Sequence, residues 1–218
     1  SNELTGTIPS SLGELSSLEV LYLYINMLTG GLNGVVLSPS VVSVNIGYNA
    51  FTGTFPLSLF RGTNVNYLYL NNNAFGGSLP DELGEFTRLV GLAVGNNGFT
   101  GTLPTTLSKL TSMQLLVLAG NGFVGDVSSL FASVGFNRNL ITLDLSNNGF
   151  SGSLPYALFS SLALSTFVGA QNCFTVSVLT AEMCNAVNLK ILDLSGMTSG
   201  NVCTTRYQGL FLDFYTVS

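Results

Sequence analysis

Residues 140–155 read LITLDLSNNGFSGSLP, and close copies of this stretch recur before and after it at a nearly constant spacing. The copies align on one asparagine, which is Asn148 in the quoted stretch. Its equivalents stand 23 to 27 residues apart, at Asn2, Asn26, Asn49, Asn73, Asn97, Asn121 and Asn172, with a degenerate position at Met197. A period of this length is typical of a solenoid whose units stack around one continuous core. The sequence therefore predicts one elongated domain.

Each complete copy begins with the pattern L-x-x-L-x-L, as in Leu140, Leu143 and Leu145 or in Leu189, Leu192 and Leu194. The period of two in its second half predicts a short strand with the leucines inward and the intervening residues outward. The asparagine then ends the strand, and we expect its amide to bond backbone groups of the turn and to stack with the asparagines of neighbouring repeats. This predicts a structural ladder made of Asn26, Asn49, Asn73, Asn97, Asn121, Asn148 and Asn172.

The second half of each repeat continues around the core. A Phe or Leu two residues after the asparagine is expected inside, followed by a glycine at a tight bend. Apolar residues then recur three apart, as in Leu83, Phe86 and Leu89, which is typical of a short helical or 3-10 turn. Two repeats depart from the pattern, because the one at Asn26 lacks the proline and outer turn and the one at Asn121 is longer. We interpret both as neutral irregularities, since outer loops tolerate insertion.

The pattern L-x-x-L-x-L-x-x-N-x-L/F resembles the leucine-rich repeat. The continuation, seen as LTGTIP, FTGTFP, FTGTLP and FSGSLP, is similar to the plant-specific type of this repeat. That type builds receptor-kinase ectodomains and polygalacturonase inhibitors of plants, and similar repeats occur in surface antigens of kinetoplastid protists. The resemblance covers residues 1–197, in which the first repeat is truncated, and leaves residues 198–218 as a C-terminal capping segment of the same domain.

The resemblance implies an α/β repeat solenoid. The expected fold is a curved right-handed leucine-rich repeat superhelix with a parallel concave β-sheet and short helical or 3-10 turns on the convex side. It also implies a second short sheet near the T-G-x segment.

Three cysteines lie towards the C-terminus, at Cys173, Cys184 and Cys203. No C-x-x-C pair and no histidine accompanies them, which favours a disulfide over a metal site. Their clustering resembles the cysteine-bearing C-terminal caps of extracellular members of the family. The odd count leaves one thiol unpaired or paired with a residue outside this chain.

Composition argues against several classes of function. The net charge of −5 provides no basic stripe for nucleic acid. The absence of histidine removes the commonest general base and metal ligand, so we expect neither an enzyme nor a cofactor. No apolar run is long enough for a membrane span, and no signal peptide opens the chain. Because the first repeat is incomplete, we expect a fragment of a longer protein whose flanking segments could carry an anchor.

Three outward columns of side chains are expected on the concave sheet. Tyrosines gather at its N-terminal end, small and aliphatic residues occupy the middle, and two aspartates stand at its C-terminal end. Clustered tyrosines on a rigid sheet are good anchors for a partner, although they also pack on one another across strands. The candidate partner-binding residues are Tyr22, Tyr24, Tyr67, Tyr69, Val117, Asp144 and Asp193.

Asp144 and Asp193 share one column two strands apart, about 10 Å at the usual strand spacing. That separation is near the upper limit for an inverting carboxylate pair. Val168 stands between them, and nothing in the sequence points to a raised pKa for either. We therefore expect both to be solvated or to contact a partner.

The leading hypothesis is a non-catalytic recognition module that binds a protein or peptide through its concave face. It would belong to a larger extracellular or cell-surface protein. One alternative is a structural or ice- or glycan-contacting surface, because the chain is rich in Thr, Ser and Asn and poor in charge. Another is the ectodomain of a receptor kinase whose catalytic part lies outside this chain.

Overall fold

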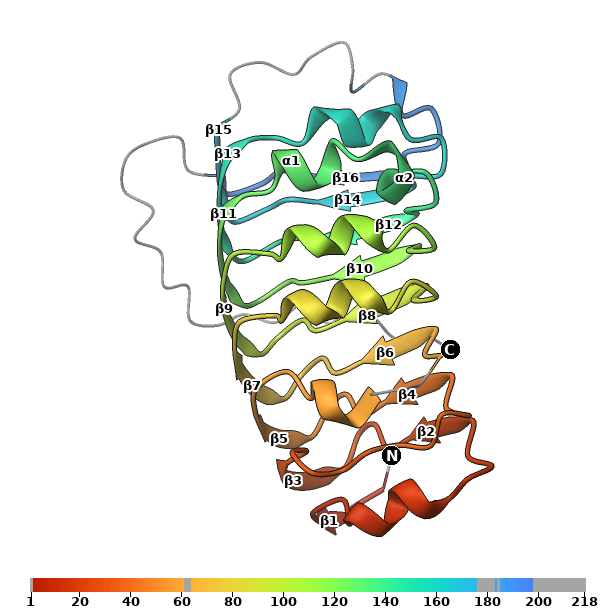
Figure 1. The fold of residues 1–218 in the computed structure, drawn as a ribbon. Helices are drawn as coiled ribbons and strands as arrows, with labels where there is room; N and C mark the ends of the chain where they lie inside the picture. Colours follow the sequence, from red (N-terminus) through yellow and green to blue (C-terminus); the bar gives the residue numbers. More distant parts are fainter. Residues whose placement is uncertain (1, 61–63, 176–182, 184, 198–218) are drawn as a thin grey trace.

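Two parallel sheets run along the stack of repeats in the computed structural model, and short helices cover a third side (Figure 1). The structure describes residues 2–60, 64–175, 183 and 185–197. The first sheet takes one strand from each repeat, in the order of the chain. Its strands are β2 (Val20–Tyr22), β4 (Ser43–Asn45), β6 (Tyr67–Tyr69), β8 (Gly91–Ala93), β10 (Leu115–Val117), β12 (Thr142–Asp144), β14 (Thr166–Val168) and β16 (Ile191–Asp193).

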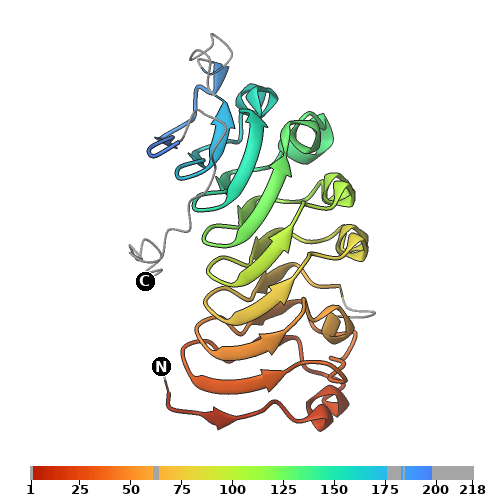
Figure 2. The same cartoon turned by 90° about the vertical axis from the view of Figure 1, so that its left-hand side faces the viewer.

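The second sheet follows the ladder asparagines and contains the T-G-x segments. Its strands are β1 (Thr5–Gly6), β3 (Met27–Gly31), β5 (Ala50–Gly53), β7 (Ala74–Gly77), β9 (Gly98–Gly101), β11 (Gly122–Asp126), β13 (Gly149–Ser153) and β15 (Cys173–Thr175). The stack bends towards the side of the first sheet, which we call the concave sheet (Figure 2).

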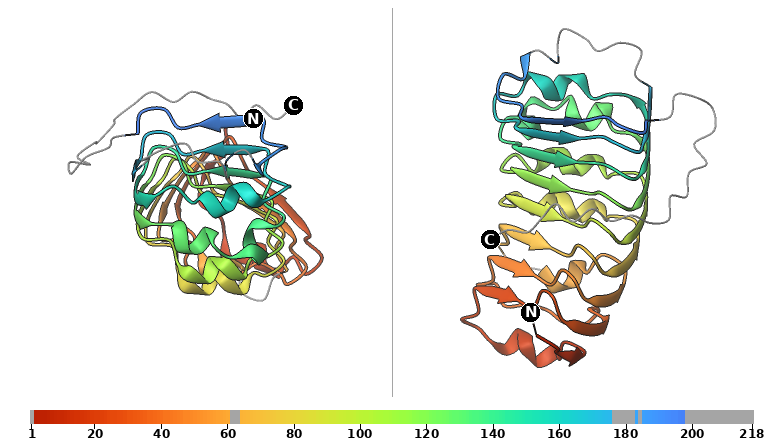
Figure 3. Two further views of the ribbon diagram at one scale, coloured as in Figure 1. Left: turned by 90° about the horizontal axis from the view of Figure 1, so that it is seen from above. Right: turned by 180° about the vertical axis from the view of Figure 1, so that it is seen from behind.

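Helices occupy the side opposite the concave sheet (Figure 3). Most are single 3-10 turns that start directly after the proline of the repeat, because proline fixes an extended entry and cannot continue a strand ladder. They are η1 (Ser10–Glu14), η2 (Leu57–Phe60), η3 (Asp81–Glu85), η4 (Thr105–Lys109) and η5 (Tyr156–Ser160). Two short α-helices, α1 (Ser128–Phe131) and α2 (Val134–Asn137), complete the set in the described part of the chain.

The period-two register is present in the concave sheet. Leu143 and Leu145 are fully buried, and the same inward side is taken by Leu68, Leu92 and Leu116. Neighbouring strands pair in parallel without a shift, so that equivalent residues of successive repeats stand side by side. The prediction of a leucine-rich repeat solenoid with a parallel concave sheet, a second sheet and convex turns is confirmed.

A column of phenylalanines forms the spine of the core. Successive rings stack nearly parallel, with centroids 6.1–6.3 Å apart and interplanar angles of 6–16°. Offset stacking at this distance is favourable beyond the area that it buries. The rings belong to Phe51, Phe75, Phe99, Phe123, Phe150 and Phe174, all of which are fully buried or nearly so.

The residue before each ladder asparagine has a left-handed backbone. It has φ between 53° and 66° from Ile25 onward, although only two of these positions are glycine. The left-handed position starts the turn from the concave sheet into the second sheet. The non-glycine residues in this column are Ile25, Tyr48, Asn72, Asn96, Asn147 and Gln171, and the glycines are Gly120 and Gly196.

The two irregular repeats have convex segments that differ from the single 3-10 turn of the other repeats. Residues 32–42 pass from β3 to β4 without a helix, yet Leu37 and Val41 are buried there. The longer repeat at Asn121 folds its extra residues into α1 and α2, whose Phe131 and Phe136 rings pack 5.7 Å apart in the core. The extra residues therefore contribute to packing.

The C-terminal end differs from expectation. Leu192 was predicted to point into the core with Leu194, but its side chain is 42% exposed and Leu194 is only partly buried. Leu192 lies on β16, the last described strand, and Leu194 follows directly after it. Among the described residues, only β14 pairs with β16. An inward-facing position becomes buried only where a further layer covers it. The expected capping segment, residues 198–218, lies outside the described residues.

Candidate functional site

The central column of the concave sheet contains Tyr22, Asn45, Tyr69, Ala93, Val117, Asp144, Val168 and Asp193 in direct register. Because alternate residues of a strand face opposite sides, this column faces away from the core. It divides into an aromatic N-terminal part, an apolar middle and an acidic C-terminal part.

The N-terminal part is an exposed tyrosine cluster made of Tyr22, Tyr24, Tyr67 and Tyr69. Tyr22 is 57% exposed, Tyr24 and Tyr67 are also exposed, and Tyr69 is half-buried. Ring centroids within one repeat lie 6.3 Å apart in both pairs, Tyr22 with Tyr24 and Tyr67 with Tyr69. The rings therefore pack partly on one another and still present a large amphipathic surface.

Polar contacts and a glycine hold this cluster in place. The Tyr22 hydroxyl lies 3.2 Å from Ser43 Oγ across β2 and β4. On the other side, Gly91 leaves room for two rings, since a Cβ there would lie 3.0 Å from Tyr67 Cδ1 and from the Tyr69 hydroxyl. Burial raises the pKa of Tyr69, and the phenols of Tyr67 and Tyr22 raise it further. The Tyr69 hydroxyl therefore stays neutral and can act as a hydrogen-bond donor and acceptor.

Val117 offers little surface to a partner. It was predicted as a contact residue, but it is only 8% exposed. On the inner radius of a curved sheet, side chains of adjacent strands crowd one another, and Ala93 beside it is equally closed off. The middle of the concave face is consequently a packed apolar floor.

Asp144 corrects a second expectation, because it is not a solvated surface residue. It is 8% exposed, and its Oδ1 accepts hydrogen bonds from Ser146 N at 2.9 Å and from Ser146 Oγ at 2.7 Å. Burial raises the pKa of Asp144, the Ser146 bonds oppose this, and the charge of Asp193 adds to it. The expectation that nothing would raise a pKa in this column was therefore wrong.

Asp193 is more accessible than Asp144. Its carboxylate is half-buried and accepts a hydrogen bond from Ser195 N at 2.9 Å. Val168 separates it from Asp144 in the register. In the described part of the chain, no three His, Cys, Asp or Glu side chains come together as a metal site would require.

The ladder asparagines link successive repeats through their side chains. Asn97 is typical, because its Nδ2 donates to Leu70 O, Val94 O and Gly95 O at 3.0–3.2 Å. Its Oδ1 accepts a hydrogen bond from Phe75 N of the preceding repeat at 3.1 Å. Asn26, Asn49, Asn73, Asn121, Asn148 and Asn172 make the equivalent acceptor bond. These amides are occupied by the fold and are not free to bind a partner.

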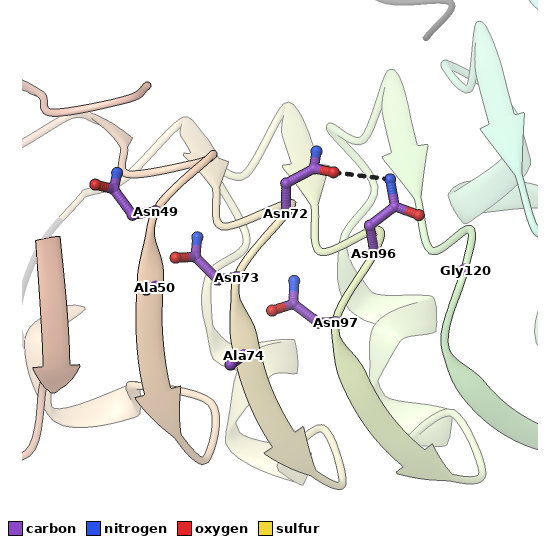
Figure 4. Close-up of a pocket in the computed structure, with 8 residues that line it drawn as sticks. All are labelled: Asn49, Ala50, Asn72, Asn73, Ala74, Asn96, Asn97 and Gly120. Atoms are coloured by element: carbon purple, nitrogen blue, oxygen red, sulfur yellow. Dashed lines mark hydrogen bonds between the residues drawn. The ribbon is translucent and has the colours of Figure 1, made fainter. Parts of the chain in front are cut away.

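A groove that the sequence analysis did not identify lies where the concave strands turn into the second sheet (Figure 4). Its cavity volume is about 480 Å³, and it is lined by Asn49, Ala50, Asn72, Asn73, Ala74, Asn96, Asn97 and Gly120. The available signal was the doublet of asparagines at residues 72–73 and 96–97, in which only the second member belongs to the ladder.

Cys173, at the start of β15, is disulfide-bonded. The other two predicted cysteines, Cys184 and Cys203, lie outside the described residues. Among the helices of the described residues, none has the length and apolar character needed to cross a membrane.

A stack of parallel strands with short outer turns and a concave sheet defines a repeat solenoid. The family described as Leucine Rich Repeat matches residues 64–86 and 139–161. This match and the solved structures below support a leucine-rich repeat family of the plant type. A comparison with curated protein sequences gave no match.

Solved structures show the same architecture. The ectodomain of the Arabidopsis thaliana membrane receptor kinase GASSHO1/SCHENGEN3, in complex with CASPARIAN STRIP INTEGRITY FACTOR 2, is similar with a TM-score of 0.72 and 26% sequence identity. The Arabidopsis receptor kinase HAESA, in complex with the peptide hormone IDA and the co-receptor SERK1, is similar with a TM-score of 0.73 and 26% identity. Each similarity covers 90% of this chain, which spans 26% and 37% of the two relatives.

Proposed function

We propose that this protein is a non-catalytic recognition module that binds a protein or peptide through the N-terminal half of its concave face. The observation that carries the proposal is the tyrosine cluster on β2 and β6 and the residues just beyond, where three rings are exposed. Tyrosine combines large contact area with a polar tip and loses little conformational entropy on binding.

The chemistry of the cluster limits the kind of ligand. Ser43, Asn45 and Asn71 accompany the tyrosines, so that this part of the face has hydrogen-bonding groups and no formal charge. We therefore expect the bound segment of the ligand to be extended, and to be apolar or aromatic and uncharged where it contacts the tyrosine rings. Asp193 adds an acidic contact at the C-terminal end of the concave sheet. Val117 is nearly buried and offers little contact surface.

The relatives support this class of function. GASSHO1/SCHENGEN3 and HAESA were solved with a bound factor and a bound peptide hormone. Since this chain spans only 26% and 37% of them, its place in a larger extracellular or cell-surface protein is part of the proposal. The disulfide at Cys173 agrees with an oxidising compartment. Attachment to a kinase outside this chain is a more specific form of the same proposal.

The test is selection of binders from a random linear-peptide library against the full chain, followed by affinity measurement. The variant Tyr22→Ala/Tyr67→Ala is expected to weaken the selected peptides by at least about tenfold, because aromatic anchors carry much of the binding energy. The matched control is Leu162→Ala, which removes a side chain that is 68% exposed and lies outside the cluster. Peptides that bind the double tyrosine variant as tightly as the unaltered protein would refute the proposed site.

A further inference from the structure

The groove at the turn edge continues along several repeats. Its main part reaches from Asn49 to Gly120, and a second hollow lined by Asn26, Met27, Thr29, Tyr48, Asn49, Ala50 and Asn72 extends it towards the N-terminus. The two hollows share Asn49, Ala50 and Asn72, so they form one track, which we call the amide groove. No acidic or basic side chain lines it.

Two rows of asparagine amides lie in this groove, and only one row belongs to the ladder (Figure 4). Asn72 and Asn96 form the other row, in which Asn96 Nδ2 donates to Asn72 Oδ1 at 3.0 Å. This bond orients both amides. Among the described residues, no other hydrogen bond reaches either side chain, which leaves the Asn72 amino group and the Asn96 carbonyl available to a ligand.

Backbone conformation alone does not account for this pair. Asn72 and Asn96 occupy the left-handed column, a setting that favours asparagine. However, Ile25, Tyr48 and Gln171 hold the same conformation in other repeats, so asparagine is not required there. The next position is Gly120, where a Cβ would lie 2.2 Å from Asn96 Oδ1. The glycine thus keeps the acceptor end of the amide pair open.

The other end of the amide groove presents an aromatic ring. Tyr48 occupies the left-handed position one repeat before Asn72 and is 38% exposed. At the start of the second-sheet strands β5 and β7, Ala50 and Ala74 line the groove with methyl groups only. One track therefore offers a ring, a donor, an acceptor and a shallow apolar surface in successive repeats.

We propose that the amide groove binds a neutral oligosaccharide lying across the strands. Sugar hydroxyls both donate and accept hydrogen bonds, which matches the paired amide ends, and sugar C–H faces pack on aromatic rings and methyl groups. The absence of charge in the lining disfavours an acidic sugar.

A peptide fits this track less well. An extended peptide would need free backbone groups of the turn, but these bond the adjacent repeat, as Tyr48 N does to Asn71 O, Asn72 N to Gly95 O and Asn96 N to Ala119 O. Anchoring a peptide side chain would also require a deeper apolar pocket than Ala50, Ala74 and the exposed Met27 provide. This inference concerns a surface separate from the tyrosine cluster and does not depend on the function proposed for that cluster.

The experiment titrates the full chain with cellohexaose, xylohexaose, mannohexaose and chitohexaose, and with hexagalacturonate as an acidic comparator. Isothermal calorimetry is expected to show saturable binding of at least one neutral hexasaccharide. Asn72→Gly/Asn96→Gly should weaken that binding by at least about tenfold, because it removes both amides and glycine accepts the left-handed backbone. Tyr48→Asn should also weaken it, and this variant removes the ring without altering the amide pair.

The matched control is Asn147→Gly, which makes the same change in the same left-handed column, outside the amide groove. It should bind the sugar like the unaltered protein, and so should Tyr22→Ala/Tyr67→Ala. Absence of saturation by every neutral hexasaccharide up to about 1 mM would overturn the inference. So would preference for hexagalacturonate, an equal loss in Asn147→Gly, or full affinity in the double asparagine variant. Loss in the double tyrosine variant would place the sugar on the concave face and would equally overturn it.

Discussion

Asn97 shows how a single side chain couples two neighbouring repeats. Its amide serves three carbonyls and one N–H group, drawn from its own repeat and the preceding one. Asn97→Leu would leave these backbone groups without partners in a partly buried turn. We expect the free energy of unfolding in urea to fall by about 1–3 kcal/mol or more, since several hydrogen bonds are lost together.

The matched control for this prediction is Asn96→Gly. Asn96 has φ of 53° and makes one side-chain hydrogen bond, to Asn72. Glycine accepts that backbone without strain, so the unfolding free energy is expected to change by less than about 1 kcal/mol. Similar losses in the two variants would show that the ladder amide has no special structural role.

Asp144 provides a prediction that depends on pH. Burial raises its pKa in the folded state, so the folded protein holds this proton more tightly than the unfolded chain does. Its contribution to stability is therefore full below an unfolded value of about 3.9 and is lost as pH rises through the raised folded value. Asp144→Asn removes the buried charge and keeps an oxygen that accepts from Ser146. We expect the variant to be more stable than the unaltered protein at pH 7.

Urea denaturation at a series of pH values checks this prediction. The advantage of Asp144→Asn should vanish below about pH 3.9 and grow as pH rises. Asp193→Asn is the control, because it makes the same change at a less buried carboxylate of the same column. A stability difference that is independent of pH would contradict the prediction.

Sequence reasoning at the level of single residues identified which side of each strand faces out, but not how accessible each residue is. The two-residue period placed Tyr22, Val117 and Asp144 in one column, and the structure has this register. The exposed fraction of a side chain depends on how closely its neighbours pack on a curved sheet. This packing shields Val117 and Asp144 from solvent. The amide pair was missed because Asn72 and Asn96 stand next to ladder residues and have no periodic signal of their own.

At the level of elements, the convex turns pack closely through a glycine. A Cβ on Gly84 of η3 would lie 2.5 Å from the backbone oxygen of Thr106 in η4. Backbone cannot rotate away as a flexible side chain does, so the two turns would have to separate. Gly84→Ala is expected to lower the free energy of unfolding by about 1–3 kcal/mol in urea denaturation.

Gly31→Ala is the control for this packing effect. Gly31 ends β3, and the nearest atom to a Cβ there is Thr52 O at 3.8 Å, an ordinary contact. Alanine should be neutral or stabilising by up to about 1 kcal/mol, because it restricts the unfolded chain. Destabilisation of the same size at both glycines would indicate a general effect of losing glycine and not the contact between η3 and η4.

The strands were predictable because a period of two is a strong local signal, and the 3-10 turns followed from apolar residues spaced three apart. The helices α1 and α2 were not predicted. The repeat at Asn121 was recognised only as longer, and its extra residues form a second buried turn around Phe131 and Phe136. Tertiary packing determines whether an insertion becomes a loop or a helix. The repeat period of the sequence does not indicate which of the two forms.

For the whole molecule, one repeating unit of about 24 residues was sufficient to predict the architecture. Each repeat contacts mainly its neighbours, so a correct register in one repeat extends to all the others. The same reasoning fails at the ends of the stack, where the neighbour is missing. Leu192 illustrates this, because an inward position on the last described strand remains 42% exposed.

Nearest-neighbour stability also predicts where the molecule opens first. Cys173 is disulfide-bonded and lies on β15, next to the partly exposed strand β16. If that bond supports the C-terminal end, a reductant should release β15 and β16 before any other strand, since an unsupported solenoid frays from its terminus. Hydrogen exchange with and without reductant should show protection falling first in β15 and β16, while β8 and β10 keep theirs. Cys173→Ser should reproduce the pattern without reductant, and reductant should then have no further effect. Loss of protection that begins in β2 or β4, or that is uniform along the stack, would refute the assignment of this disulfide to the C-terminal end.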